Sequence, residues 1–258
     1  MLKGLYAAHT GLRNEQNRMD VMTNNLANAS TVGFKKEGAT SQSFGSVLAV
    51  KVKDASVGLA RRQYIGWNNP GVKIGENYTD YKEGSFRITD NPLDVALSGD
   101  GFFAIEFTNK AGETSIKYTR AGDFTMTVDG FLTTNEGDYV LDENSRRIQL
   151  NPQDAVTIRT DGSIVQNDEV VARIQVTDFA DYNYLEKYGE TYFQPVQGAQ
   201  ITTSTATVNA GILEMSNVQV VSEMVNMIAI TRQYESNQKV MQTYDSSLEI
   251  AVNQLGKL

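Results

Sequence analysis

Residues 213–258 read LEMSNVQVVSEMVNMIAITRQYESNQKVMQTYDSSLEIAVNQLGKL, with no proline and no glycine before Gly256. Apolar or aromatic side chains recur every seven residues, at Met227, Tyr234, Met241, Leu248 and Leu255. We assign the intervening position of this seam to Val220, Met224, Thr231, Gln238, Asp245 and Val252. Such a heptad repeat predicts a long amphipathic helix that packs against a partner helix. Ser216 and Gln219 have the spacing of a capping box, which predicts that the helix starts there.

The first thirty residues carry a matching stripe. Leu5, Leu12, Met19 and Leu26 lie seven residues apart, and we assign the polar residues His9, Gln16 and Thr23 to the intervening positions. Polar residues in a seam fix register and partner number while lowering stability. We therefore expect the two terminal helices to form coiled coils with each other and with further copies of the chain. The alternative is a helical hairpin that packs only on its own domain.

Composition limits the possible functions. The chain has 258 residues, of which 40% are hydrophobic, enough for one large or two modest domains. Its net charge of −8 is uneven, because residues 1–36 carry +3 and residues 37–212 carry −9. An acidic middle argues against nucleic acid as a partner. The absence of cysteine excludes disulfides, thiol catalysis and cysteine-based metal sites.

The N-terminus predicts no cleaved targeting segment. Residues 1–12 alternate polar and apolar side chains and lack the apolar core of a signal peptide. No apolar run approaches the length of a transmembrane helix. If the protein leaves the cytoplasm, we expect a route that leaves this end intact.

The middle of the chain changes its period. The helical pattern breaks after Leu26, and residues 37–75 are predicted to be an extended or irregular linker region. From about Asn77 apolar residues alternate with a period of two, and Asp129-Gly130 and Asp161-Gly162 have the signature of hairpin turns. We predict an α+β fold, in which long N- and C-terminal coiled-coil-forming helices flank a mainly antiparallel β middle domain. The predicted segments are 1–36 (helical), 37–75 (linker), 76–212 (β domain) and 213–258 (helical).

Residues suited to catalysis or metal binding are scarce. The single histidine, His9, lies on a helical stripe, where a polar seam residue is a better interpretation than a metal ligand. Asp123 to Gly130 resembles a calcium loop only faintly, because its ligand positions hold Thr and the closing Glu is missing. No nucleotide-binding or hydrolase motif occurs. We expect no enzymatic activity, no cofactor, no metal and no small-molecule substrate.

One short stretch in the β region stands out. Gly99-Asp100-Gly101-Phe102 is predicted to be a structural turn, because two glycines permit positive φ. Phe102 and Phe103 are adjacent, so on a strand their side chains point to opposite faces. This leaves two interpretations: a buried pair that bridges two layers, or one exposed ring that serves an interface.

Three blocks of the sequence resemble a known family. The first is NNLANASTVGFK at 24–35, and the second is NPLDVALSGDGFF at 91–103 with YTRAGDF at 118–124. The third is LEMSNV at 213–218, followed by MVNMI at 224–228, Tyr234, Glu235 and Asn237. Together they resemble the bacterial flagellar rod and hook proteins, the axial proteins of the basal body.

The resemblance implies a structural subunit that polymerises through its terminal helices into a hollow shaft, which transmits torque and passes exported subunits. It implies copies of the chain, other rod and hook proteins and the flagellar type III export apparatus as partners, with export to the basal body and no signal cleavage. The length is most similar to that of distal rod subunits. A proximal rod or hook subunit, or an exported adhesin-like β module, are the alternatives. The expected self-assembly residues are Leu5, Leu12, Met19, Asn24, Asn25, Leu26, Asn28, Gly33, Phe34, Met224, Met227, Tyr234, Met241, Leu248 and Leu255.

Overall fold

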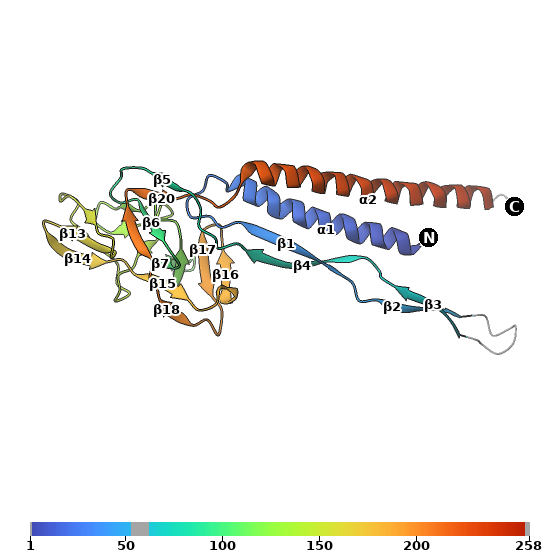
Figure 1. The fold of residues 1–258 in the computed structure, drawn as a ribbon, viewed down its shortest axis with the longest axis horizontal. Helices are drawn as coiled ribbons and strands as arrows, with labels where there is room; N and C mark the ends of the chain where they lie inside the picture. The colour runs from blue at the N-terminus through green and yellow to red at the C-terminus, as the bar shows by residue number, and fades with distance from the viewer. Residues whose placement is uncertain (1, 53–61, 256–258) are drawn as a thin grey trace. The chain divides into compact units, whose positions relative to one another are not determined.

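The structure is a computed structural model that describes residues 2–52 and 62–255 (Figure 1). The chain forms two compact units. Unit 1 consists of Met1–Leu26, Glu37–Tyr78 and Val220–Leu258, and unit 2 consists of Ala27–Lys36 and Thr79–Gln219. Long helices near both ends of the chain and mainly antiparallel strands between them confirm the predicted α+β class.

Unit 1 contains two long helices, α1 (Leu2–Ala27) and α2 (Val220–Leu255), which lie side by side (Figure 1). A Cβ atom on Gly4 would lie 2.2 Å from the Tyr244 hydroxyl, and one on Gly11 would lie 2.9 Å from the Asn237 amide nitrogen. The two contacts are seven residues apart on each helix and run in opposite directions along the chain. The helices are therefore antiparallel, and the side chains of Tyr244 and Asn237 cover the two glycines.

The seam of α2 differs from the predicted one at its second position. Met227, Tyr234, Met241 and Leu248 are half-buried. Of the predicted second row, Thr231 is half-buried, but Val220, Met224, Gln238, Asp245 and Val252 are exposed. The covered residues between the predicted ones are Ile230, Asn237, Tyr244 and Ala251. From Tyr234 onward, the second covered residue of each heptad therefore follows the first by three positions rather than four. Gly4 and Gly11 of α1 explain this spacing, because they leave room for the side chains of Tyr244 and Asn237.

The same correction applies to α1. Leu5, Leu12, Met19 and Leu26 are half-buried, whereas His9, Gln16 and Thr23 are exposed. The covered face instead includes Ala8 and Glu15, one residue before the predicted positions. The apolar stripe was located correctly, but its second row flanks the stripe on the opposite edge from the one predicted.

The start of α2 was also predicted wrongly. The Ser216 hydroxyl accepts a hydrogen bond from the amide of Val218 at 3.2 Å, and the helix begins only at Val220. Residues 212–214 form β20 (Ile212–Glu214), which pairs with β5 (Phe86–Ile88). Residues 213–219 therefore belong to unit 2 and not to the helical segment, because pairing with a strand of unit 2 fixes them in extended form.

The region predicted to be extended forms two strand pairs in unit 1. β1 (Glu37–Ser43) pairs with β4 (Val72–Thr79), and β2 (Val47–Val52) pairs antiparallel with β3 (Arg62–Asn68). The first pair contacts α1, since the Asn14 side chain donates to the Ser41 hydroxyl at 2.9 Å. Asn25 is fully buried and exchanges two hydrogen bonds with the backbone of Glu37, which joins the end of α1 to β1.

Unit 2 is built around a nine-stranded sheet with the order β16-β17-β8-β7-β11-β10-β9, in which β15 pairs with β7 and β18. Smaller sheets contain β12-β13-β14, β19-β6 and β20-β5. The bounds of the remaining elements are β6 (Val95–Ser98), β7 (Phe102–Thr108), β8 (Thr114–Thr119), β9 (Thr125–Met126), β10 (Leu132–Thr133), β11 (Tyr139–Val140), β12 (Thr157–Ile158), β13 (Ser163–Gln166), β14 (Glu169–Arg173), β15 (Val176–Phe179), η2 (Tyr182–Tyr184), β16 (Leu185–Tyr188), β17 (Tyr192–Pro195), β18 (Ile201–Thr203) and β19 (Thr207–Ala210). The Asp-Gly turns are confirmed, because Gly130 and Gly162 have φ of +84° and +82° between paired strands.

Strand β7 separates two apolar cores. Phe103 packs with Val95, Leu132 and Ile164 in one cluster, and Phe102 packs with Tyr118, Phe179 and Phe193 in the other. The exposed fractions of Phe102 and Phe103 are 1% and 0%. The structure therefore selects the buried pair that bridges two layers and not the exposed interface ring.

Phe103→Ala is expected to lower the free energy of unfolding of unit 2 by about 3–5 kcal/mol, because it opens a cavity in a closed core. Phe86→Ala, at a position that is 44% exposed, is the control and should cost far less. Hydrogen exchange of the β7 amides at increasing urea measures both. Similar costs for the two variants would contradict the assignment of the core.

Candidate functional site

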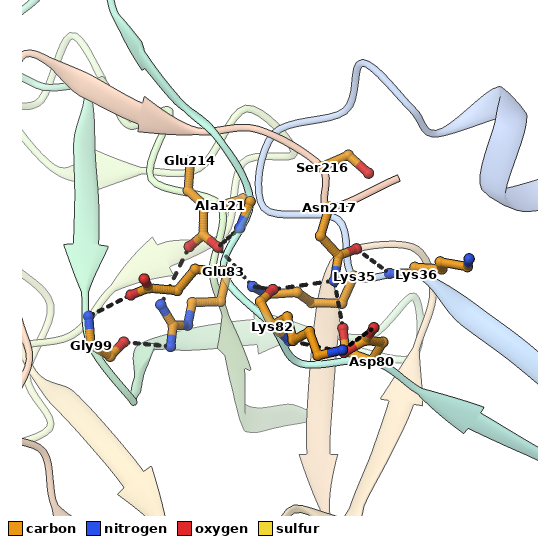
Figure 2. Close-up of polar contacts among 12 residues, drawn as sticks. Lys35, Lys36, Asp80, Lys82, Glu83, Gly99, Ala121, Glu214, Ser216 and Asn217 are labelled. Carbon is orange, nitrogen blue, oxygen red and sulfur yellow. Dashed lines mark hydrogen bonds and ion pairs between the residues drawn. The ribbon is translucent and has the colours of Figure 1, made fainter. Parts of the chain in front are cut away.

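Three stretches of unit 2 and two single residues, all distant in sequence, meet in what we term the junction (Figure 2). It comprises residues 31–36, 80–85, 213–217 and the pair Gly99 and Arg120. Val32 forms an antiparallel bridge with Met215, and the Gly33 amide donates to the Glu214 carbonyl at 2.8 Å. The Met215 amide donates to the Ser85 carbonyl at 2.8 Å. The N-terminal segment therefore lies against the strand that leads to the last helix.

The centre of the junction is the carboxylate of Glu214, which is 0% exposed. It accepts hydrogen bonds from the Lys35 ammonium at 2.7 Å, the Gly84 amide at 3.0 Å and the Arg120 guanidinium at 3.3 Å. The side chains of Lys35 and Arg120 are 1% and 3% exposed. Burial lowers the pKa of Lys35, and the neighbouring Glu214 carboxylate opposes this shift. Buried charges are tolerated when they are paired and hydrogen-bonded, which is the case here.

The two cations also bind backbone oxygens. Lys35 donates to the Lys82 carbonyl at 2.7 Å, and Arg120 donates to the Gly99 carbonyl at 2.7 Å. Gly99 in turn donates from its amide to the Glu83 carboxylate at 2.6 Å. The cluster therefore holds both the 80–85 stretch and the loop before β7.

The sequence-predicted turn lies beside this cluster. Gly99 and Gly101 have φ of +105° and +145°, a region that favours glycine. The carbonyl of Asp100 accepts a hydrogen bond from the Ser204 hydroxyl at 2.6 Å, and Phe102 is buried behind it. The contacts of this turn are therefore with other residues of unit 2, as expected for a structural turn.

Two glycines permit the close approach of backbones in the junction. Gly33 has φ of +68°, and a Cβ there would lie 2.2 Å from the Ala121 amide nitrogen. A Cβ on Gly84 would lie 1.8 Å from the Met215 carbonyl oxygen. Both obstacles are backbone atoms that cannot turn aside, so any larger residue would force the segments apart.

A side-chain amide completes the junction. The Asn217 oxygen accepts from the Lys36 amide at 2.7 Å, and its nitrogen donates to the carbonyls of Asp80 and Lys82 at 2.7 and 3.2 Å (Figure 2). The Asp80 amide also donates to the Lys36 carbonyl at 2.8 Å. Asn217 therefore bonds to two segments besides its own.

The predicted self-assembly residues fall into two groups. Asn25, Asn28, Gly33 and Phe34 are buried within the chain. The helical members of the set are half-buried, except Asn24 and Met224, which are exposed. The side chain of Leu255 lies outside the described residues. The structure brings the helical members together as stripes along α1 and α2.

Sequence reasoning missed the charged centre of the junction. Glu214, Arg120 and Asn217 all lie in blocks that carry the family resemblance, but no predicted role was attached to them. A usable signal was present, because Glu214 stands between Leu213 and Met215 in a short apolar stretch. A lone charge at such a place indicates a buried pair.

Residues 2–52 and 62–255 contain neither a cluster suited to a metal ion nor a helix suited to a bilayer. No group of three His, Asp or Glu side chains in this part of the chain is placed to hold a metal ion. None of its helices combines the length and the apolar character needed to cross a bilayer.

Comparison with known families places the chain. Residues 5–35 match the family described as "Flagella basal body rod protein", residues 96–166 match "Flagellar hook protein FlgE/F/G D1 domain", and residues 209–255 match "Flagellar basal body rod FlgEFG protein C-terminal". The flagellar basal-body rod protein FlgG of Bacillus subtilis is 32% identical over 98% of this chain and 99% of its own length. The chain belongs to the flagellar basal-body rod protein family.

Other members of the rod family are similar over their full length. The rod protein FlgF of Mesorhizobium japonicum is 32% identical over 99% of both chains. The hook-basal body complex protein FlhO of Bacillus subtilis is 29% identical over the whole of both chains. The matched residue ranges include Lys35, Arg120 and Glu214, the three charged residues of the junction.

Lys35→Met is expected to lower the free energy of unfolding of unit 2 by about 3 kcal/mol, because a buried pair loses one partner. Glu214→Gln should cost more, since it leaves two buried cations without a carboxylate. The control is Glu143→Gln, which breaks an exposed ion pair with Arg173 and should cost less than about 1 kcal/mol. Hydrogen exchange of the β7 amides reports each value. Equal costs for Glu214→Gln and Glu143→Gln would show that the buried cluster does not stabilise the unit.

Proposed function

We propose that this rod-family chain is a structural subunit that polymerises through unit 1. The observation that carries the proposal is an uncovered apolar stripe on α2. Val221, Val225 and Ile228 are 77%, 61% and 54% exposed, and their spacing of four and three residues puts them on one side of the helix. Contiguous exposed apolar residues of this kind mark a contact with another protein. A further copy of the chain is the partner that family membership favours.

The strand pair β2–β3 supplies a second uncovered surface in unit 1. Its large apolar side chains are exposed, namely Val47, Leu48, Val50, Tyr64, Ile65 and Trp67. An isolated two-stranded pair is at best marginally stable in water. We infer that neighbouring subunits cover these side chains in the assembled state.

The proposed assembly is a hollow helical shaft. The stripes of α1 and α2 suit coiled-coil contacts, and heterologous contacts that do not close a ring generate an open helical polymer. The shaft would transmit torque and pass exported subunits, with other rod and hook proteins at its ends. We propose a mechanical and non-catalytic role in the basal body, reached through the flagellar type III export apparatus without cleavage of the N-terminus.

Within the family, we propose a position in the distal rod. Chain length and the near-complete match to FlgG support this position. Equal identity to FlgF supports a second candidate, a subunit of another rod segment. The gene of this chain can replace either the FlgG gene or the FlgF gene of a flagellated host. The replacement that restores motility identifies the position.

Val225→Lys is expected to abolish polymerisation, because it places a charge in the centre of the α2 stripe. Gln238→Lys adds the same charge at an exposed polar position of α2 and should polymerise normally. Electron microscopy and sedimentation of concentrated protein give the readout, and circular dichroism of dilute protein confirms that the helices persist. Normal filaments from Val225→Lys would rule out this stripe as an assembly surface.

The single tryptophan reports on the β2–β3 pair. Trp67 is 74% exposed, so its emission in the dilute monomer should be that of a ring in water. Polymerisation is expected to shift the emission to the blue as a neighbour covers the ring. Concentrated Val225→Lys protein, which should remain monomeric, is the control. If the filaments and the monomer have the same tryptophan emission, neighbouring subunits do not cover Trp67 and the proposal is wrong.

A further inference from the structure

The polypeptide passes between the two units four times, after residues 26, 36, 78 and 219. Three of these crossings lie close in sequence to Asn217 or to a residue that is hydrogen-bonded to its side chain. Lys36 is the last residue before one crossing, Asp80 follows another by two residues, and Asn217 precedes the last by two. One side chain therefore connects three of the four segments that enter or leave unit 2.

The chemistry of an asparagine fits this task. Its side chain offers one acceptor and two donors, and Asn217 uses both kinds, accepting from Lys36 and donating to Asp80 and Lys82. An aspartate would place negative charge against two carbonyl oxygens, and alanine would leave the segments without the link. The nearby Lys82–Asp80 ion pair lies within one segment, so it does not replace the link between segments.

Asn217 is itself held in a fixed position. The preceding residues are anchored through the buried Glu214 carboxylate and the Met215 amide, which donates to Ser85. The Ser216 hydroxyl accepts from the Val218 amide and fixes the turn on the other side. The clamp thus rests on the most buried part of the junction rather than on a free loop.

We propose that Asn217 is a positioning residue that clamps the segments crossing between the units and thereby restrains movement of one unit relative to the other. While the Asn217 side chain keeps its hydrogen bonds, the segments that contain Lys36, Asp80 and Asn217 move together. With the clamp open, these segments lose the side-chain bonds nearest the last crossing, while the Asp80 amide still donates to the Lys36 carbonyl. That the restraint serves a torque-bearing shaft rests on the proposed function, but the restraint itself is a property of the single chain.

The test uses full-length protein at monomeric concentration. The chain has no cysteine, so cysteines introduced at the exposed positions Gln238 in unit 1 and Glu169 in unit 2 carry the only two spin labels. Pulsed electron paramagnetic resonance then gives the distribution of distances between the units. Asn217→Ala and Asn217→Asp are compared with Asn183→Ala, which removes one side-chain hydrogen bond, to Asp181, from η2, away from the crossings in the sequence.

Both Asn217 variants are expected to broaden the distance distribution, while Asn183→Ala leaves it unchanged. The Lys36 amide should exchange about tenfold faster in Asn217→Ala, as the loss of one hydrogen bond implies. The melting temperature of unit 2 should stay close to that of Asn183→Ala.

Three results would overturn the inference. These are an unchanged distribution in the Asn217 variants, a wild-type distribution that is already as broad as theirs, and loss of the unit 2 fold in both variants. Each is measured on monomers, so a failure of polymerisation, which would count against the proposed function, leaves this test intact.

Discussion

The buried carboxylate of Glu214 is the interaction on which unit 2 depends. Burial of an ionised group is costly unless opposite charge and hydrogen-bond donors surround it. Here the compensating groups come from Lys35, Gly84 and Arg120, none of which is near Glu214 in the sequence. The carboxylate is fully paired only when all three stretches are in place. Unit 2 is therefore completed by the segment Ala27–Lys36, and its folding joins stretches that are distant in the sequence.

The two units differ in how completely they bury their apolar residues. Unit 2 encloses two cores on either side of β7, centred on Phe102 and Phe103. Unit 1 leaves large apolar side chains exposed along α2 and the β2–β3 pair, Val221 and Trp67 among them. This difference supports the proposal that unit 1 carries the assembly surfaces. The junction matters because α1 ends and α2 begins within a few residues of it.

Local patterns predicted local structure well, and contacts between distant residues could not be predicted. Period-two alternation and Asp-Gly pairs located the strands and turns, and heptad spacing located the stripes with Met227 and Leu12. The second row of each seam was misplaced, because a heptad permits a step of three or four and only the partner helix selects between them. Ser216 was interpreted as a helix cap, but pairing of β20 with β5 overrode that local signal. Lys35 and Glu214 are 179 residues apart, a separation that no periodicity encodes.

The family resemblance and the junction have a common physical basis. The three blocks that carry the resemblance each supply a part of one cluster: Lys35 from the first, Gly99 and Arg120 from the second, and Glu214 from the third. A change in any one of these charges leaves the others buried without compensation, so the three blocks are constrained together. The charged residues are thus fixed by the folding of the subunit, whereas the exposed stripes of unit 1 have no partner within the described chain that would fix them. Assembly is the constraint that can account for apolar side chains there, because a monomer would be more soluble with polar ones at Val221, Val225 and Trp67.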